Sequence, residues 1–134
     1  MPPIAPKRTS NLRPLKERKN VPAVGTFICT LDELDNPGAR GFTFGSGSNA
    51  FNFFIVRKGE SAFAYVNECP HAFLPLNRIT TKFLTLDEEK ILCAAHAASF
   101  QIEDGLCTGG PCAGKALLSV PLSHTNGALS IAAY

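Results

Sequence analysis

Two short clusters of metal-ligand residues constrain this chain more than any other feature of its sequence. They are Cys69-Pro-His71 and Cys93-Ala-Ala-His96, and 21 residues separate them. Each cluster supplies one thiolate and one imidazole, the ligand types that bind zinc and iron–sulfur clusters in proteins. The chain must therefore fold so that two distant loops meet around an inorganic site.

The way in which cysteine and histidine are mixed distinguishes between the two kinds of site. A structural zinc site usually presents two cysteines together and two histidines together. Here each cluster mixes the two residue types, and Cys-x-His is too tight for the usual zinc knuckle. One cysteine and one histidine from each loop suit a two-iron centre in which His₂ replaces Cys₂ on one iron. A zinc-binding structural or interaction module remains the alternative.

Short apolar runs between turn residues predict an all-β fold, an antiparallel sandwich or barrel. A hairpin formed by residues 51–57 and 61–67 would deliver Cys69. A second hairpin, formed by residues 81–86 and 90–94, would deliver Cys93. The other expected strands are residues 24–29, 42–44, 98–103, 116–122 and 128–133, with turns at Asp87-Glu88-Glu89, Asp104-Gly105 and Asn126-Gly127. No long segment has the periodicity of a helix.

The charge distribution separates an N-terminal arm from the rest of the chain. Residues 1–20 carry six basic side chains and one acidic side chain, a charge of +5, which leaves −3 for the remainder of a chain whose net charge is +2. Four prolines argue against a continuous helix there. We therefore expect a basic, Pro-rich arm over residues 1–22, packed on the domain or on a partner, and one domain over residues 23–134. An acidic body argues against nucleic-acid binding.

The sequence also indicates the cellular compartment in which we expect the protein. No apolar run approaches the ~20 residues needed to span a bilayer, and the N-terminus lacks a secretory h-region. Five cysteines are an odd number, unlike most small disulfide frameworks. We expect a cytoplasmic protein with no membrane association.

The ligand loops resemble those of Rieske-type iron–sulfur proteins, and more narrowly those of small stand-alone Rieske ferredoxins. The segment CPHAFLPL is similar to the first loop of that family, CAAHAASF to the second, and DGLCTGGPCAGKALLSVPL to the third loop and closing strand. The resemblance implies a Rieske-like fold with a cluster-binding subdomain, about residues 67–114, built on two hairpin-tip loops. It implies one [2Fe-2S] cluster, with Cys69 and Cys93 on the inner iron and His71 and His96 on the outer iron. The loop Gly109-Gly110-Pro111 would cover the cluster.

Several residues depart from the pattern of respiratory-chain Rieske proteins. Leu74 and Ala95 occupy the places of the two cysteines that form a loop disulfide in those proteins. Ala98 and Phe100 occupy the places of two hydroxyl side chains that donate hydrogen bonds to the cluster and its thiolate. Without these donors the potential should lie at the low end of the Rieske range. Ala97 stands where many members have Gly, so a positive φ there would cost free energy.

The remaining cysteines and the third histidine have less specific interpretations. Cys29 lies in an apolar run and is expected to be a buried hydrophobe. Cys107 and Cys112 flank the Gly-Gly-Pro loop, and either free thiols or a disulfide is compatible with the sequence. His124 lies beside a turn and is expected on the surface.

The resemblance implies a one-electron carrier rather than an enzyme. It would pass electrons from a reductase to a terminal oxygenase or a similar enzyme. The alternative within electron transfer is a Rieske-like small subunit of a larger reductase, such as a nitrite reductase. Phe73, Leu74 and Pro75, beside the first loop, are a candidate docking patch for a redox partner.

Overall fold

The computed structural model describes residues 12–70, 73–77, 82–93, 97–110, 112 and 114–134. Within these ranges the fold is built from antiparallel strands, as the sequence predicts, with three short 3₁₀ turns. The strands are β1 (Phe27–Thr30), β2 (Gly38–Phe44), β3 (Phe51–Lys58), β4 (Ser61–Val66), β5 (Lys90–Cys93), β6 (Ala98–Gln101), β7 (Cys107–Gly109), β8 (Ser119–Val120), β9 (Leu122–Thr125) and β10 (Ala128–Ile131). The 3₁₀ turns are η1 (Leu15–Glu17), η2 (Leu31–Glu33) and η3 (Gly47–Asn49).

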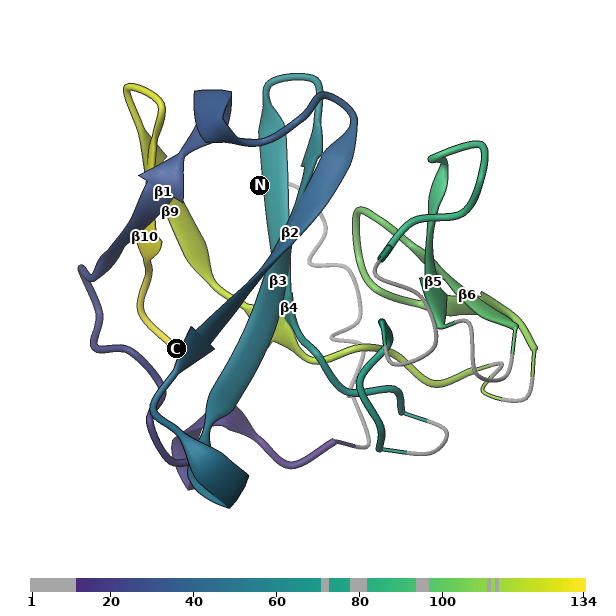
Figure 1. The fold of residues 1–134 in the computed structure, drawn as a ribbon, viewed down its shortest axis with the longest axis horizontal. Helices are drawn as coiled ribbons and strands as arrows, with labels where there is room; N and C mark the ends of the chain where they lie inside the picture. The colour runs from purple at the N-terminus through teal and green to yellow at the C-terminus, as the bar shows by residue number, and fades with distance from the viewer. Residues whose placement is uncertain (1–11, 71–72, 78–81, 94–96, 111, 113) are drawn as a thin grey trace, which may run out of the picture.

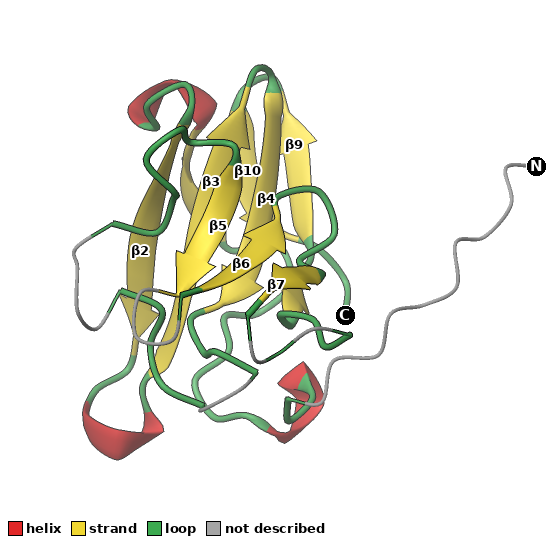
Figure 2. Cartoon of the chain, turned by 90° about the vertical axis from the view of Figure 1, so that its right-hand side faces the viewer, coloured by secondary structure: helices red, strands yellow, loops and turns green. Residues whose placement is uncertain are grey.

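Two sheets form the base of the molecule and a third sheet stands beside them. The base sheets have the strand orders β1-β10-β9 and β2-β3-β4-β8, and the third sheet has the order β5-β6-β7. Figure 1 shows β5 and β6 to the right of the base sheets, and Figure 2, turned by 90°, shows β7 next to β6. The candidate metal-ligand loops therefore belong to the smaller unit and its junction with the base.

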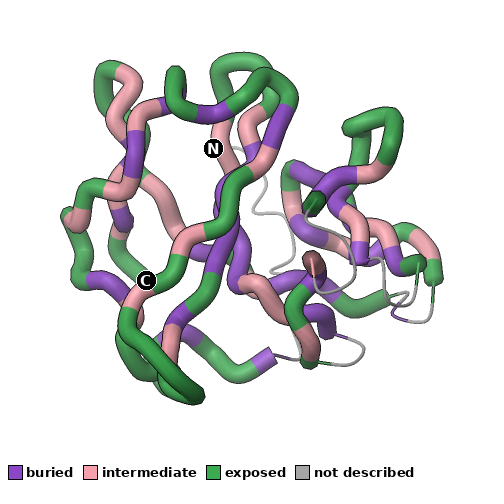
Figure 3. The backbone as a smooth tube through the Cα atoms, viewed as in Figure 1, coloured by how far each residue is buried: buried purple, intermediate pink, exposed green. Residues whose placement is uncertain are grey.

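Strand β3 is buried on both faces and forms the wall between two cores. Side chains alternate across a strand, so neighbouring residues face opposite sides. Phe53 and Ile55 belong to the base core, whereas Phe54 and Val56 belong to the core shared with the third sheet. Figure 3 shows this buried segment running through the centre of the molecule.

Aromatic packing and one buried hydrogen bond attach the third unit to this wall. The ring of Phe54 stacks on that of Phe83, with centroids 4.6 Å apart. Tyr65 of β4 reaches across the same core, and its hydroxyl donates a hydrogen bond of 2.5 Å to the carbonyl of Ile102. Burial raises the pKa of Tyr65 well above its usual value, so the hydroxyl keeps its proton.

The predicted hairpins are confirmed where local turn chemistry is strong. β3 and β4 pair up to Lys58 and Ser61, which leaves a two-residue turn at Gly59-Glu60. β9 and β10 pair up to Thr125 and Ala128, with the predicted Asn126-Gly127 turn between them. Both central residues of that turn have positive φ, 50° and 83°, as a two-residue hairpin of this kind requires.

Three predicted boundaries are wrong, each for a physical reason. The strand expected over 42–44 begins earlier, because β2 already pairs with β3 from Gly38 onward. The strand expected over 116–122 is divided, because Pro121 between β8 and β9 has no N–H to donate to a ladder. In the 81–86 segment the described residues form only an isolated bridge, Leu84 to Ile91, beside β5.

The described part of the N-terminal segment packs on the domain. Leu12 and Leu15 are buried, and Leu15 belongs to the base core. The boundary at residues 22 and 23 remains a prediction. Across the described ranges, no helix is long and apolar enough to cross a membrane.

Replacing Tyr65 by Phe should destabilise the protein by about 1–3 kcal/mol, because the buried Ile102 carbonyl would lose its hydrogen-bond donor. Urea unfolding of the two proteins measures this difference. Tyr134→Phe is the matched control: its hydroxyl lies 3.4 Å from the Pro22 carbonyl at a partly exposed site, so its loss should stay within about 0.5 kcal/mol. Equal losses in the two variants would contradict a junction role for Tyr65.

Candidate metal centre

The first ligand loop, residues 67–77, leaves the end of β4 and is closed by its own backbone. The amide of Cys69 donates to the Leu74 carbonyl at 2.8 Å, and the amide of Phe73 donates to the Cys69 carbonyl at 2.6 Å. The side chain of Asn67 fastens the base of the loop, since its carbonyl oxygen accepts from the amide of Leu76 at 2.8 Å. These contacts fix the backbone on both sides of the Cys69 thiol.

The second ligand loop joins β5 to β6 at the tip of their hairpin. Cys93 is the last residue of β5 and pairs with Ala98, the first residue of β6. Ala97 has a φ of 54°, in the left-handed region that favours Gly. The cost that the sequence analysis named for a positive φ therefore applies here, and Ala is less favourable than Gly by roughly 1 kcal/mol.

Both loops deliver their cysteines into one core. Cys69 and Cys93 are each 0% exposed and belong to the same cluster of buried residues, with Ile91 and Phe100. Two sulfur donors in an apolar, water-excluded core suit the inner side of an iron–sulfur cluster. The donor set that the structure describes therefore fits such a group.

The other two predicted ligands cannot be placed. His71 and His96 lie outside the described residues, as does Pro111 of the predicted covering loop. Within the described ranges, no three His, Cys, Asp or Glu side chains form a group that could hold a metal ion. The four-residue ligand set therefore remains a prediction.

The third loop packs directly against the second. Gly110 has a φ of 90°, and a Cβ atom on it would lie 2.9 Å from Cα of Ala98 and 3.2 Å from the Ala97 carbonyl oxygen. A side chain at this position would push the two loops apart. Its neighbour Gly109 ends β7 and pairs with Ser99. The contact between the loops is thus established, whereas the covering of a cluster by Gly109, Gly110 and Pro111 stays a prediction.

Cys107 and Cys112 are free thiols in the structure. Both are buried, and Cys107 Sγ donates to the carbonyl of Gly109 at 3.1 Å. Burial, and next a hydrogen bond with Cys107, raise the pKa of Cys112 to about 12. Cys112 belongs to the same cluster of buried residues as Cys69 and Cys93, which places a third sulfur in that core. The sequence left the pairing open and did not indicate this proximity.

Two other residues lie where the sequence predicts. Cys29 is buried in the base core, where burial raises its pKa, as expected for a small hydrophobe. His124 is exposed on β9, in the base sheet that does not contain the ligand loops.

The candidate docking patch is exposed in part. Phe73 is 57% exposed, Pro75 is also exposed, and Leu74 is half-buried. Phe73 has a φ of 59°, an unusual conformation for a bulky side chain. The loop therefore holds an aromatic ring in solvent at a conformational cost.

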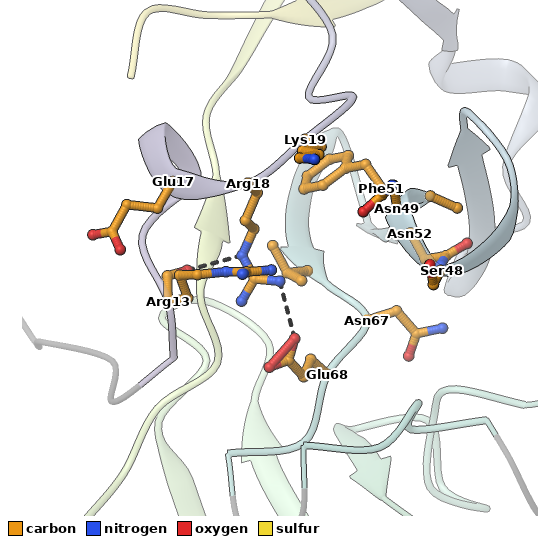
Figure 4. Close-up of a pocket in the computed structure, with 12 residues that line it drawn as sticks. Arg13, Glu17, Arg18, Lys19, Ser48, Asn49, Phe51, Asn52, Asn67 and Glu68 are labelled. Carbon is orange, nitrogen blue, oxygen red and sulfur yellow. Dashed lines mark hydrogen bonds and ion pairs between the residues drawn. The ribbon is translucent and has the colours of Figure 1, made fainter.

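One residue that approaches the site was not foreseen. Arg18 of the N-terminal segment forms an ion pair of 2.9 Å with Glu68, the residue before Cys69 (Figure 4). The sequence predicts that this arm packs on the domain or on a partner, but no signal in it indicates that Arg18 pairs with Glu68.

Comparisons with known proteins agree with this geometry. A family model, the Rieske [2Fe-2S] domain, matches residues 25–126. A search of curated protein sequences finds no match. The solved ferredoxin of carbazole 1,9a-dioxygenase from Nocardioides aromaticivorans IC177 matches with a TM-score of 0.63 at 22% identity, over 82% of this chain and 100% of that chain.

Two solved complexes give similar matches. A complex of reduced oxygenase and oxidized ferredoxin in carbazole 1,9a-dioxygenase has a TM-score of 0.61 at 21% identity, over 79% of this chain and 99% of that chain. The reduced complex between oxygenase and ferredoxin has a TM-score of 0.64 at 17% identity, over 78% of this chain and 27% of that chain. These likenesses confirm the predicted fold.

Gly110→Ala should destabilise the protein by about 1–3 kcal/mol more than Gly114→Ala, because its new Cβ collides with Ala98. Gly114 is the matched control, since its φ is 87° and a Cβ there meets nothing within 4 Å. Urea unfolding of both variants isolates the steric contribution. If the two variants unfold alike, the two loops are not held in close contact.

Proposed function

Because the chain belongs to the Rieske [2Fe-2S] domain family, we propose that it carries single electrons on one [2Fe-2S] cluster held by Cys69, His71, Cys93 and His96. One observation supports this most strongly. Cys69 and Cys93 are buried in a single core, and each begins a loop whose histidine follows two or three positions later. Bound there, the cluster supplies reversible one-electron reduction.

The residues of this chain would have different roles at the site. The two buried cysteines would hold one iron in the apolar core, and the two histidines would hold the other. The backbone turn between Cys69 and Leu74 orients the first thiol, while the Cys93–Ala98 pair orients the second. These residues would bind the cluster and exclude water. None of them would act on a substrate.

An oxygenase activity would need more ligands than the chain offers. Mononuclear iron in such enzymes is held by two histidines and a carboxylate. The sequence has three histidines. With His71 and His96 assigned to the cluster, His124 alone remains, and it lies exposed on the base. The chain is therefore an electron-transfer protein, not the terminal enzyme.

The surroundings of Cys93 favour a low reduction potential. Hydrogen bonds to the cluster sulfurs stabilise the reduced state and raise the potential. Ala98 pairs directly with Cys93, and Phe100 is buried in the same core, yet neither side chain has a hydroxyl to donate. We expect a midpoint potential on the order of −150 mV.

The solved complexes that this chain resembles pair a ferredoxin with an oxygenase. By analogy, we infer that this protein accepts electrons from a reductase and delivers them to a terminal oxygenase or similar enzyme. Phe73, Leu74 and Pro75 would form the contact, as a small apolar patch suits a weak, transient redox interface. The free thiols support a reducing compartment such as the cytoplasm.

The purified protein should be red-brown and contain two irons and two acid-labile sulfides per chain. Cys69→Ser and Cys93→Ser should each abolish the Rieske visible and EPR spectra, whereas Cys29→Ala should keep them, because that thiol lies in the base core. Colourless protein that carries one zinc would refute the proposal.

The same preparation tests the histidines. Oxidation favours proton loss from ligated imidazoles, so reduction at alkaline pH takes up a proton. The midpoint potential should then fall as pH rises, by up to about 59 mV per pH unit for one proton. A potential independent of pH into the strongly alkaline range would argue against solvent-facing histidine ligands.

Phe73→Ala should lower the rate of electron transfer to a Rieske-dependent oxygenase by roughly tenfold at subsaturating carrier, without changing the midpoint potential. The physical reason is the loss of an exposed aromatic contact beside the cluster. Leu86→Ala is the control, since Leu86 is 100% exposed on the turn before β5, outside the ligand loops. Stopped-flow reduction of the oxygenase measures both rates, and equal rates would remove Phe73 from the interface.

A further inference from the structure

We propose that the N-terminal segment 12–20 is part of the cluster site, and that Arg18 is a positioning residue for the first ligand loop. This inference rests on the proposed function, since it concerns the same cluster. It goes beyond the family, because the family match begins only at residue 25.

The segment is anchored on the base at several points. Leu12 and Leu15 are buried, and the 3₁₀ turn η1 is closed by hydrogen bonds from Glu17 N to Pro14 O and from Arg18 N to Leu15 O, each 3.0 Å. Further along, the side-chain amide of Asn20 donates to the carbonyl of Asn49 at 2.8 Å. These contacts fix the backbone position from which the Arg18 side chain extends.

Arg18 then reaches from this anchor to the first ligand loop. Its side chain is 9% exposed; Nη1 donates to Oε2 of Glu68 at 2.9 Å, and Nε donates to the carbonyl of Arg13 at 2.8 Å. Figure 4 shows both contacts in one view. Among the residues that the structure describes, Nη2 is buried without an acceptor. A buried cation of this kind depends strongly on its one carboxylate partner.

Glu68 transmits this contact to the cluster site. Its side chain is 23% exposed, and its backbone amide donates to the Val66 carbonyl at 2.8 Å. The next residue is Cys69, so a single peptide unit joins Glu68 to the proposed ligand. Holding the Glu68 side chain therefore also restrains the backbone that carries the Cys69 thiol.

The charges predict a further effect on the cluster. In the native pair the negative charge of Glu68 is neutralised by Arg18. Without Arg18, an uncompensated carboxylate would lie beside the loop and oppose the addition of an electron to the cluster. Removing the Glu68 charge instead would leave the cation and favour reduction. The two neutralising substitutions should thus shift the potential in opposite directions.

The test uses the intact, cluster-loaded protein and the variants Arg18→Gln and Glu68→Gln. Arg18→Gln should lower the equilibrium constant for cluster reduction roughly fivefold, and Glu68→Gln should raise it by a similar factor. Both should speed the loss of visible absorbance in the presence of a chelator by about tenfold, because the first loop is released. The double variant should recover a near-native potential while keeping the fast cluster loss.

Lys16→Gln is the matched control, because it removes the same charge from an exposed position of the same segment. If Arg18→Gln and Lys16→Gln have equal potentials and equal rates of cluster loss, the inference is overturned. A change in unfolding midpoint alone, with unchanged potential and EPR spectrum, would also overturn it, since that is the result of a merely structural contact.

Two outcomes separate this inference from the proposed function. Wild-type protein without a Rieske spectrum would remove the proposed function itself. A normal wild-type spectrum with native-like Arg18 variants would remove only the role of Arg18. If Arg18→Gln does not accumulate as folded protein, Glu68→Gln applies the same test from the loop side.

Discussion

The burial of both faces of β3 is the constraint on which the rest of this molecule depends. Phe53 and Ile55 complete the base core, and Phe54 and Val56 complete the core that contains Cys69 and Cys93. A small unit such as the β5-β6-β7 sheet could not bury enough apolar surface alone. It becomes stable because its apolar side chains pack against one face of β3, whose other face is already covered by the base core. The two cysteines of the proposed metal site therefore lie at a junction between two layers rather than inside either.

The sequence predicted the elements in which local chemistry and tertiary structure agree. The apolar runs 51–57 and 61–67, which flank the polar Lys58-Gly59-Glu60, predicted the central hairpin nearly to its ends. Asn126-Gly127 gave another hairpin, because few other residue pairs adopt its backbone angles. The cysteine and histidine pattern selected Cys69 and Cys93, which the structure buries in one core, while the ligand set itself stays a prediction.

Other features depend on contacts between distant residues and could not be read from local patterns. The 82–86 segment has the composition of a strand but forms a single bridge, since pairing depends on its approach to Ile91. No local pattern in the sequence places Cys112 in the same core as Cys69, because the strands β5, β6 and β7 and their connections lie between the two residues. Arg18 was counted as one charge of a basic arm, whereas its burial against Glu68 is decided by the docking of Leu12 and Leu15. Composition describes a segment as a whole and does not show which of its charges becomes buried.

The contact between Arg18 and Glu68 has a consequence for the order in which the protein assembles. The two residues are 50 positions apart, and Asn20 likewise binds a carbonyl 29 positions later. During synthesis the N-terminal segment precedes both partners, so Asn20 cannot bind until residue 49 has followed and Arg18 cannot until residue 68 has followed. Contacts of long sequence separation also close a long loop, which makes them late events in folding. Residues 12–20 thus reach their final place only after much later residues have been made, and the loop that follows Glu68 is held from the N-terminal side only once the strands β1 to β4 have emerged.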